Sequence, residues 1–100
     1  MLAYCDRFGR LIGDDVFDGA RGCSVSLSYR RLLHGALANG ARAMIVVHNH
    51  PSGKAIPSPE DIVSTRSLSA LSCPMQVVLI DHLIVGRSAV FSMRSAGLLE

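Results

Sequence analysis

The stretch that decides the fold reads AMIVVHNH and runs from Ala43 to His50. Its first five residues are all apolar, and such a run without polar alternation is typical of a short strand buried in the centre of a sheet. Residues two apart in an extended chain point to the same side. The stretch therefore predicts a central strand over residues 43–47. This strand leads into His48 and His50, whose imidazoles share one side, while Asn49 points away.

A hairpin and a helix are predicted before this strand. Residues 2–5 and 10–17 are strand-like runs separated by turn residues. Apolar residues at helical spacing follow them. Either Ser26 or Ser28 can cap this helix, because a serine side chain accepts a hydrogen bond from an unpaired first-turn N–H. The Asn-Gly pair at 39–40 ends it.

A loop and a second helix are predicted beyond the histidines. Residues 51–57 hold two prolines and one glycine, which favours a loop. The helix covers residues 58–72 and has Pro59 at its first position, where proline is favoured. Pro74 stops it. Its inner face is expected to consist of Thr65, Leu68 and Leu71.

Strand-like residues at 77–80 and 83–85, then a turn at Gly86 and a last short strand at 89–93, complete the expected elements. The resulting order is β-β-α-β-α-β-β, which indicates an α/β chain with a mixed sheet and helices packed on it. A length of 100 residues fits one domain, residues 1–100. Hydrophobic residues make up 49% of the chain and charged residues 18%, so the chain can bury a core.

Composition also bounds the partners and the compartment. The net charge is only +2, and Arg30-Arg31 is the only basic pair, so DNA binding is not signalled by this chain alone. The apolar runs are far too short to span a membrane. Cys5, Cys23 and Cys73 form no C-x-x-C pair and follow no secretory leader. These features predict a reducing cytoplasm and buried free thiols.

The two histidines suggest a metal site with a third ligand nearby. Asp61 lies eleven residues beyond His50, after a loop that can fold back. Zinc binds imidazole nitrogen and carboxylate oxygen, and three protein ligands leave the fourth position to water, as in catalytic zinc sites. The alternative is structural. Ser58-x-x-Asp61 resembles a capping box, in which the carboxylate accepts a hydrogen bond from the serine N–H.

The longer strings HNHPSG at 48–53 and PSPED at 57–61 resemble the JAMM metalloprotease motif, which is H-x-H-P followed by serine, two residues and aspartate. The string LIDHLIVG at 79–86 is similar to the RadC branch of the JAB/MPN superfamily. The resemblance runs from about Leu2 to Met93. It implies a curved mixed sheet with packed helices and a single RadC-like JAB/MPN domain.

The resemblance also implies residue roles. His48, His50 and Asp61 would ligate one zinc ion, with water as the fourth ligand. Ser58 would hydrogen-bond the developing oxyanion or hold the bound water. The implied activity is hydrolysis of an amide or isopeptide bond in a peptide substrate. The alternative is a non-catalytic zinc-binding or interaction module, of the RadC type associated with DNA repair or mobile elements.

The general base departs from the family pattern. RadC-like chains usually carry a glutamate upstream, and this chain has Asp14 and Asp15 there. Asp15 is the preferred counterpart and Asp14 the alternative, because neighbours on a strand face opposite ways. Aspartate is one methylene shorter than glutamate, and a misplacement of about 1 Å can cost about a hundredfold in rate. The alternative for both is a solvated strand end.

Two further expectations concern the surroundings of the site. Ligating histidines usually donate their second N–H to a carboxylate or carbonyl. Asp81 or His82 could supply such a contact, but only one of them, since neighbours in a strand face apart. A structural role for the pair is the alternative. Short exposed strands near both termini suggest a homodimer.

Overall fold

The computed structural model describes residues 2–15, 25–49 and 53–99. The strands are β1 (Leu2–Cys5), β2 (Leu11–Asp15), β3 (Ala43–Asn49), β4 (Val78–Val85) and β5 (Val90–Ser92). The helices are α1 (Val25–Ala38) and α2 (Pro59–Ser72), and a 3-10 turn (Cys73–Met75) follows α2. The predicted α/β class with a mixed sheet is confirmed.

The sheet has the order β2-β1-β3-β4-β5, so β3 is its central strand, as the apolar run predicts. β3 pairs with β4 in parallel, and the other three pairings are antiparallel. Asp15 pairs with Leu2, and Leu2 pairs with Val46. Val46 in turn pairs with His82. Side chains in such a row point to one face of the sheet.

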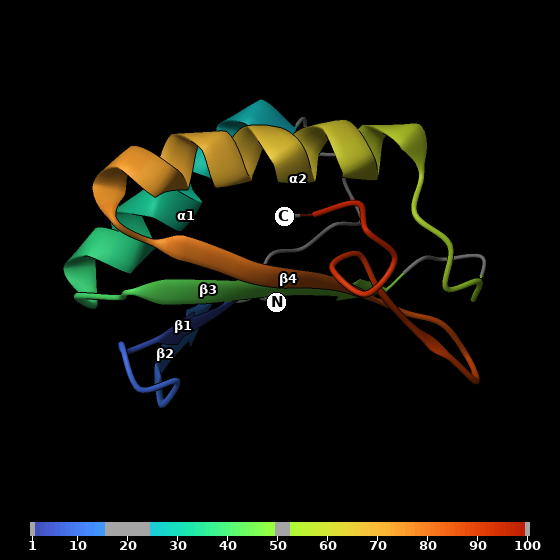
Figure 1. Ribbon diagram of the computed structural model, residues 1–100, viewed down its shortest axis with the longest axis horizontal. Helices are drawn as coiled ribbons and strands as arrows, with labels where there is room; N and C mark the ends of the chain where they lie inside the picture. Colours follow the sequence, from blue (N-terminus) through green and yellow to red (C-terminus); the bar gives the residue numbers. More distant parts are fainter. Residues whose placement is uncertain (1, 16–24, 50–52, 100) are drawn as a thin grey trace.

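Both helices pack against one face of the sheet, and the first hairpin curls away from them (Figure 1). Tyr4 is 1% exposed, and its hydroxyl donates a hydrogen bond to the carbonyl of Leu32 in α1 at 3.0 Å. A Cβ on Gly35 would lie only 2.0 Å from this hydroxyl, so the glycine permits the close packing of ring and helix. Within residues 2–15, 25–49 and 53–99, no helix has the length and hydropathy needed to cross a membrane.

The core lies between the helices and the sheet. Its buried members include Leu2, Tyr4, Leu32, Met44, Leu68, Leu79, Met93 and Leu99. The inner face of α2 is rotated from the expected one. Thr65, Leu68 and Ser72 are buried, whereas Leu71 is 47% exposed. Ser72 replaces Leu71 inside because residues 61, 65, 68 and 72 share one side of a helix with 3.6 residues per turn.

The runs at 77–80 and 83–85 form one continuous strand, β4. The register shifts between Met44 and Ile45, whose partners are Leu79 and Asp81, so Ile80 is an extra residue on β4. This irregularity sets the direction of the polar pair. His82 lies on the helix-covered face, and Asp81 points to the other face.

Two smaller expectations are corrected. α1 begins at Val25, before both Ser26 and Ser28, so neither serine precedes the helix. Cys5 is buried as expected, but Cys73 is exposed, because it begins the turn that follows α2. The third cysteine, at position 23, lies outside the described residues.

Candidate metal centre

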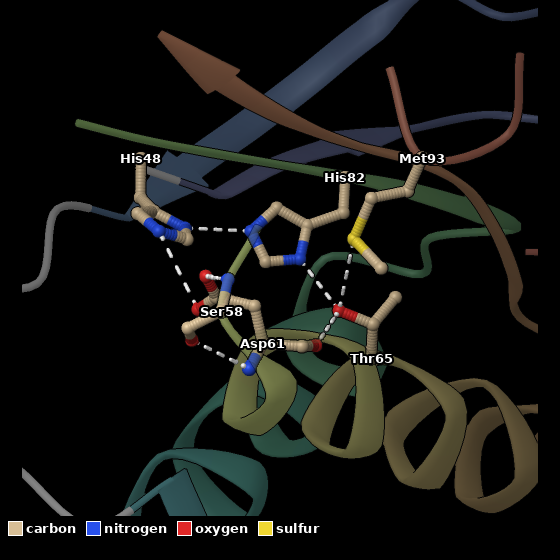
Figure 2. Close-up of polar contacts among 6 residues, drawn as sticks. All are labelled: His48, Ser58, Asp61, Thr65, His82 and Met93. Carbon is tan, nitrogen blue, oxygen red and sulfur yellow. Dashed lines mark hydrogen bonds and ion pairs between the residues drawn. The ribbon is translucent and has the colours of Figure 1, made fainter. Parts of the chain in front are cut away.

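The end of β3 brings His48 to the first turn of α2 (Figure 2). His48 Nε2 lies 3.6 Å from Asp61 Oδ1, and the two side chains are 30% and 18% exposed. Two of the three predicted ligands are therefore side by side. His50, the third, lies outside the described residues.

Asp61 forms the capping box that the sequence offered as one alternative, and its second carboxylate oxygen faces His48. Its Oδ2 accepts a hydrogen bond from the backbone N–H of Ser58 at 2.8 Å, and its own N–H donates to Ser58 Oγ at 3.1 Å. This is a complete capping box. The other oxygen, Oδ1, faces His48. One carboxylate can thus cap α2 with one oxygen and bind a cation with the other.

The spacing of the two donors fits one tetrahedral ion. Zinc bonds of about 2.0–2.1 Å in a tetrahedral arrangement separate two donor atoms by about 3.4 Å. The observed separation of His48 Nε2 and Asp61 Oδ1 is 3.6 Å. Within the described part of the chain no group of three metal-binding side chains converges. These two donors therefore satisfy the geometry for part of a site, to which His50 would add the third ligand.

His82 and Thr65 continue the polar network behind His48. His48 Nδ1 lies 2.6 Å from His82 Nε2, and His82 Nδ1 lies 2.6 Å from Thr65 Oγ1 (Figure 2). Thr65 Oγ1 also donates to the carbonyl oxygen of Asp61 at 2.6 Å. His82 and Thr65 are only 6% and 3% exposed. Of the pair Asp81-His82, His82 is therefore the residue behind the candidate ligand.

Sequence reasoning placed Thr65 on the inner face of α2 but gave it no role at the site. The available signal was its position four residues after Asp61, which puts both on one side of the helix. A threonine at that spacing can bond the carbonyl one turn earlier. The contact with His82 depends on the pairing of β3 with β4, which the sequence does not reveal.

Asp81 anchors the segment that follows β4 on the opposite face. Its Oδ1 accepts hydrogen bonds from the N–H groups of His82 at 2.7 Å and Arg94 at 3.1 Å, and Ser92 donates to Oδ2. Desolvation raises the pKa of Asp81. The bonds from Ser92, Arg94 and His82, with the charge of Arg94, outweigh it and leave the pKa below its ordinary value. Asp81 is therefore a structural residue.

The loop after His50 is held by the turn between β4 and β5. The N–H of Arg87 donates to the carbonyl of Gly53 at 2.9 Å. A Cβ on Gly86 would lie 2.7 Å from that carbonyl oxygen and 2.8 Å from the N–H nitrogen of Ala55. Gly86 thus permits a backbone approach that no other residue allows without a shift.

The two candidates for the general base lie on opposite faces of β2. Asp14 pairs with Ala3 and points away from the helices, whereas Asp15 lies on the face that carries His48. Asp15 binds Arg31 of α1 through both oxygens, at 3.1 Å and 2.8 Å. Two strand spacings, about 9–10 Å, separate β2 from β3. Asp15 is therefore on the correct face, and its role as a base stays a prediction.

Comparisons with known proteins identify the family of this chain. Residues 1–98 match the family model of the RadC-like JAB domain. A UPF0758 protein of Pseudoalteromonas translucida is 36% identical over 99 residues, covering 99% of this chain and 44% of the relative. A UPF0758 protein of Rhodobacter capsulatus is 39% identical over 100 residues, covering 98% and 46%. A UPF0758 protein of Chloroflexus aggregans is 49% identical over 63 residues, covering 63% and 28%.

The chain spans less than half the length of these relatives. The match to the family model nevertheless covers almost all of its residues. The mixed sheet with its two helices agrees with that match. The chain belongs to the RadC-like JAB domain family.

Proposed function

We propose that this domain is a zinc-dependent hydrolase of JAMM type that cleaves an amide or isopeptide bond. His48, His50 and Asp61 would hold the ion. One observation carries the proposal: His48 Nε2 lies 3.6 Å from Asp61 Oδ1, while the other carboxylate oxygen is engaged by Ser58. A nitrogen and an anionic oxygen at this spacing suit one small divalent cation.

Zinc bound here would supply a water with a pKa lowered to about 7 and would polarise the scissile carbonyl. Ser58 and Asp15 would supply the hydrogen bond to the substrate and the proton transfer. Ser58 Oγ accepts the N–H of Asp61, so its own hydrogen is left to donate to the substrate carbonyl oxygen. Asp15 would take a proton from water and pass it to the leaving amine. That transfer requires the Asp15 carboxylate to leave Arg31.

Metal content of purified protein tests the proposal. The wild-type chain should bind one zinc ion, and zinc at a hundred times its dissociation constant should stabilise the fold by about 2.7 kcal/mol. His48→Ala should lose the ion and the stabilisation. His34→Ala, at an exposed position of α1, is the matched control and should keep both. If the wild-type protein holds no zinc, cobalt or manganese, and zinc does not raise its melting temperature, the proposal fails.

A second candidate is a non-catalytic zinc-binding or interaction module associated with DNA repair or mobile elements. The ion pair between Asp15 and Arg31 favours it, since it occupies both oxygens of the preferred base. If this second candidate is correct, the protein binds zinc tightly and cleaves no member of a peptide and isopeptide library. Asp15→Asn then changes neither its zinc binding nor its lack of cleavage. Detectable cleavage that Asp15→Asn abolishes would decide for the hydrolase.

A further inference from the structure

Three short contacts connect α2 to His48 and return to the residue where they begin. They join the Asp61 carbonyl to Thr65, Thr65 to His82, and His82 to His48, each at 2.6 Å. His48 Nε2 then faces Asp61 Oδ1. Figure 2 shows these side chains in one continuous series from helix to strand. Because only certain atoms carry hydrogens, the series has a direction.

The direction is set at Asp61. A carbonyl oxygen cannot donate, so the hydrogen in its 2.6 Å contact with Thr65 Oγ1 comes from the threonine. If the threonine hydrogen pointed elsewhere, two oxygens would face each other at that distance. The sulfur of Met93, at 3.6 Å, is a weaker acceptor for the same hydrogen. Donation to either acceptor leaves Thr65 Oγ1 to accept from His82.

The hydrogen of His82 therefore lies on Nδ1, which contacts Thr65 Oγ1. A neutral imidazole has one N–H, so its Nε2 carries a lone pair. That lone pair accepts from His48, whose hydrogen must also lie on Nδ1. By the same rule the lone pair of a neutral His48 lies on Nε2, which faces Asp61 Oδ1 at 3.6 Å. Two acceptor atoms that face each other require a cation or a hydrogen between them, so this arrangement suits a bound metal ion.

We propose that Thr65 and His82 are positioning residues that fix His48 as the Nδ1–H tautomer and so present its Nε2 lone pair to the metal position. The inference rests on the proposed zinc site for its consequence. The relay itself, which runs from Thr65 through His82 to His48 Nδ1, is tested in the metal-free protein, where a protonated His48 would also donate from Nε2 to Asp61. Imidazole ligates a metal through its unprotonated nitrogen. The hydrogen bond that the other ring nitrogen makes decides which of the two nitrogens is unprotonated. The same helix turn thus supplies a ligand oxygen and the start of the relay that prepares the ligand nitrogen.

The test reads the tautomers directly. Long-range ¹H–¹⁵N NMR of the metal-free protein with labelled histidine should show His48 and His82 both protonated on Nδ1. Thr65→Val keeps the shape of the side chain but removes the hydroxyl, so His48 and His82 should each lose the Nδ1–H form or populate both tautomers. Thr65→Ser should restore them. Zinc affinity, measured by competition with a chelator, should fall about tenfold to a hundredfold in the valine variant and recover in the serine variant.

The control is Val63→Thr, the reverse exchange at a position of α2 that is 65% exposed, and it should change neither reading. A His48 that carries no hydrogen on Nδ1 in the wild-type protein overturns the relay. So do unchanged tautomers and unchanged zinc affinity in Thr65→Val. If that variant does not fold, the wild-type and serine spectra still decide. Wild-type protein that binds no zinc contradicts the proposed function instead, and its tautomers still report on the relay.

Discussion

Two aspartates on the helix-covered face are held in different ways. The Asp61 side chain is 18% exposed, and Oδ2 is fixed by the N–H of Ser58. The Asp15 side chain is 27% exposed, and both its oxygens bind one guanidinium, that of Arg31, which is 59% exposed. The capping box orients the Asp61 carboxylate through the backbone N–H of Ser58, whereas a long side chain in solvent holds the Asp15 carboxylate weakly. The candidate metal site is therefore preorganised, and the edge of the sheet that carries the candidate base is not.

Removing the Asp61 charge gives the largest expected effect. Asp61→Asn keeps an oxygen that can accept from Ser58 but loses the anionic ligand. We expect zinc affinity to fall at least a hundredfold, while loss of charge near the helix N-terminus lowers the free energy of unfolding by only about 0.3–1 kcal/mol. Chelator competition and thermal melts measure the two. Glu60→Gln, an exposed acid in the same first turn, is the control. Equal affinity losses in both variants would mean a general charge effect instead of ligation.

Asp81→Asn should separate the two faces of β4. Removing a charged acceptor of several hydrogen bonds should lower the free energy of unfolding by about 1–3 kcal/mol at neutral pH. Zinc affinity should stay unchanged, because Asp81 points away from His48. The pKa of Asp81 is lowered in the folded state, so its stabilisation exists above the unfolded pKa of about 3.9 and disappears as the pH falls through the folded value.

Denaturant unfolding from neutral pH to below about pH 4 measures the difference in the free energy of unfolding between the wild-type and Asp81→Asn proteins. The gap in stability should close as the pH falls below about 4. A stability gap that stays constant with pH would mean that the Asp81 charge does not supply the stabilisation. A loss of zinc affinity comparable to that of Asp61→Asn would mean that Asp81 is not separate from the metal site.

The sequence predicted which elements form and which ends of them meet. The apolar run before His48 located the central strand, and the spacing from His50 to Asp61 allowed the loop to fold back. Local spacing was also enough for the capping box, since it lies within one helix turn. These features depend on residues close along the chain, where periodicity and cap chemistry act directly.

The sequence could not choose between Asp81 and His82, or find the partner of Thr65. Alternation along a strand says that only one of two neighbours faces a site, but the extra residue Ile80 decides which one. Likewise, the exposure of Leu71 depends on how α2 is rotated over the sheet. Register and helix rotation are set by packing across the whole core, and no local pattern encodes them.

The Asp15–Arg31 pair should give the smallest change in stability. Exposed ion pairs are worth about 0–1 kcal/mol, so Asp15→Asn and Arg31→Gln should each lower the free energy of unfolding by less than that. Both should leave zinc affinity intact, because the pair lies two strands from β3.

Their effects on turnover should oppose one another if Asp15 is the base. The Asp15→Asn variant loses activity, and the Arg31→Gln variant, whose Asp15 carboxylate is released, retains or gains it. Peptide and isopeptide cleavage by both zinc-loaded variants measures this. Equal losses of activity in the two variants would mean that catalysis needs the intact ion pair and not a released carboxylate. Asp15 would then be held in place for catalysis as firmly as Asp61 is held by its capping box.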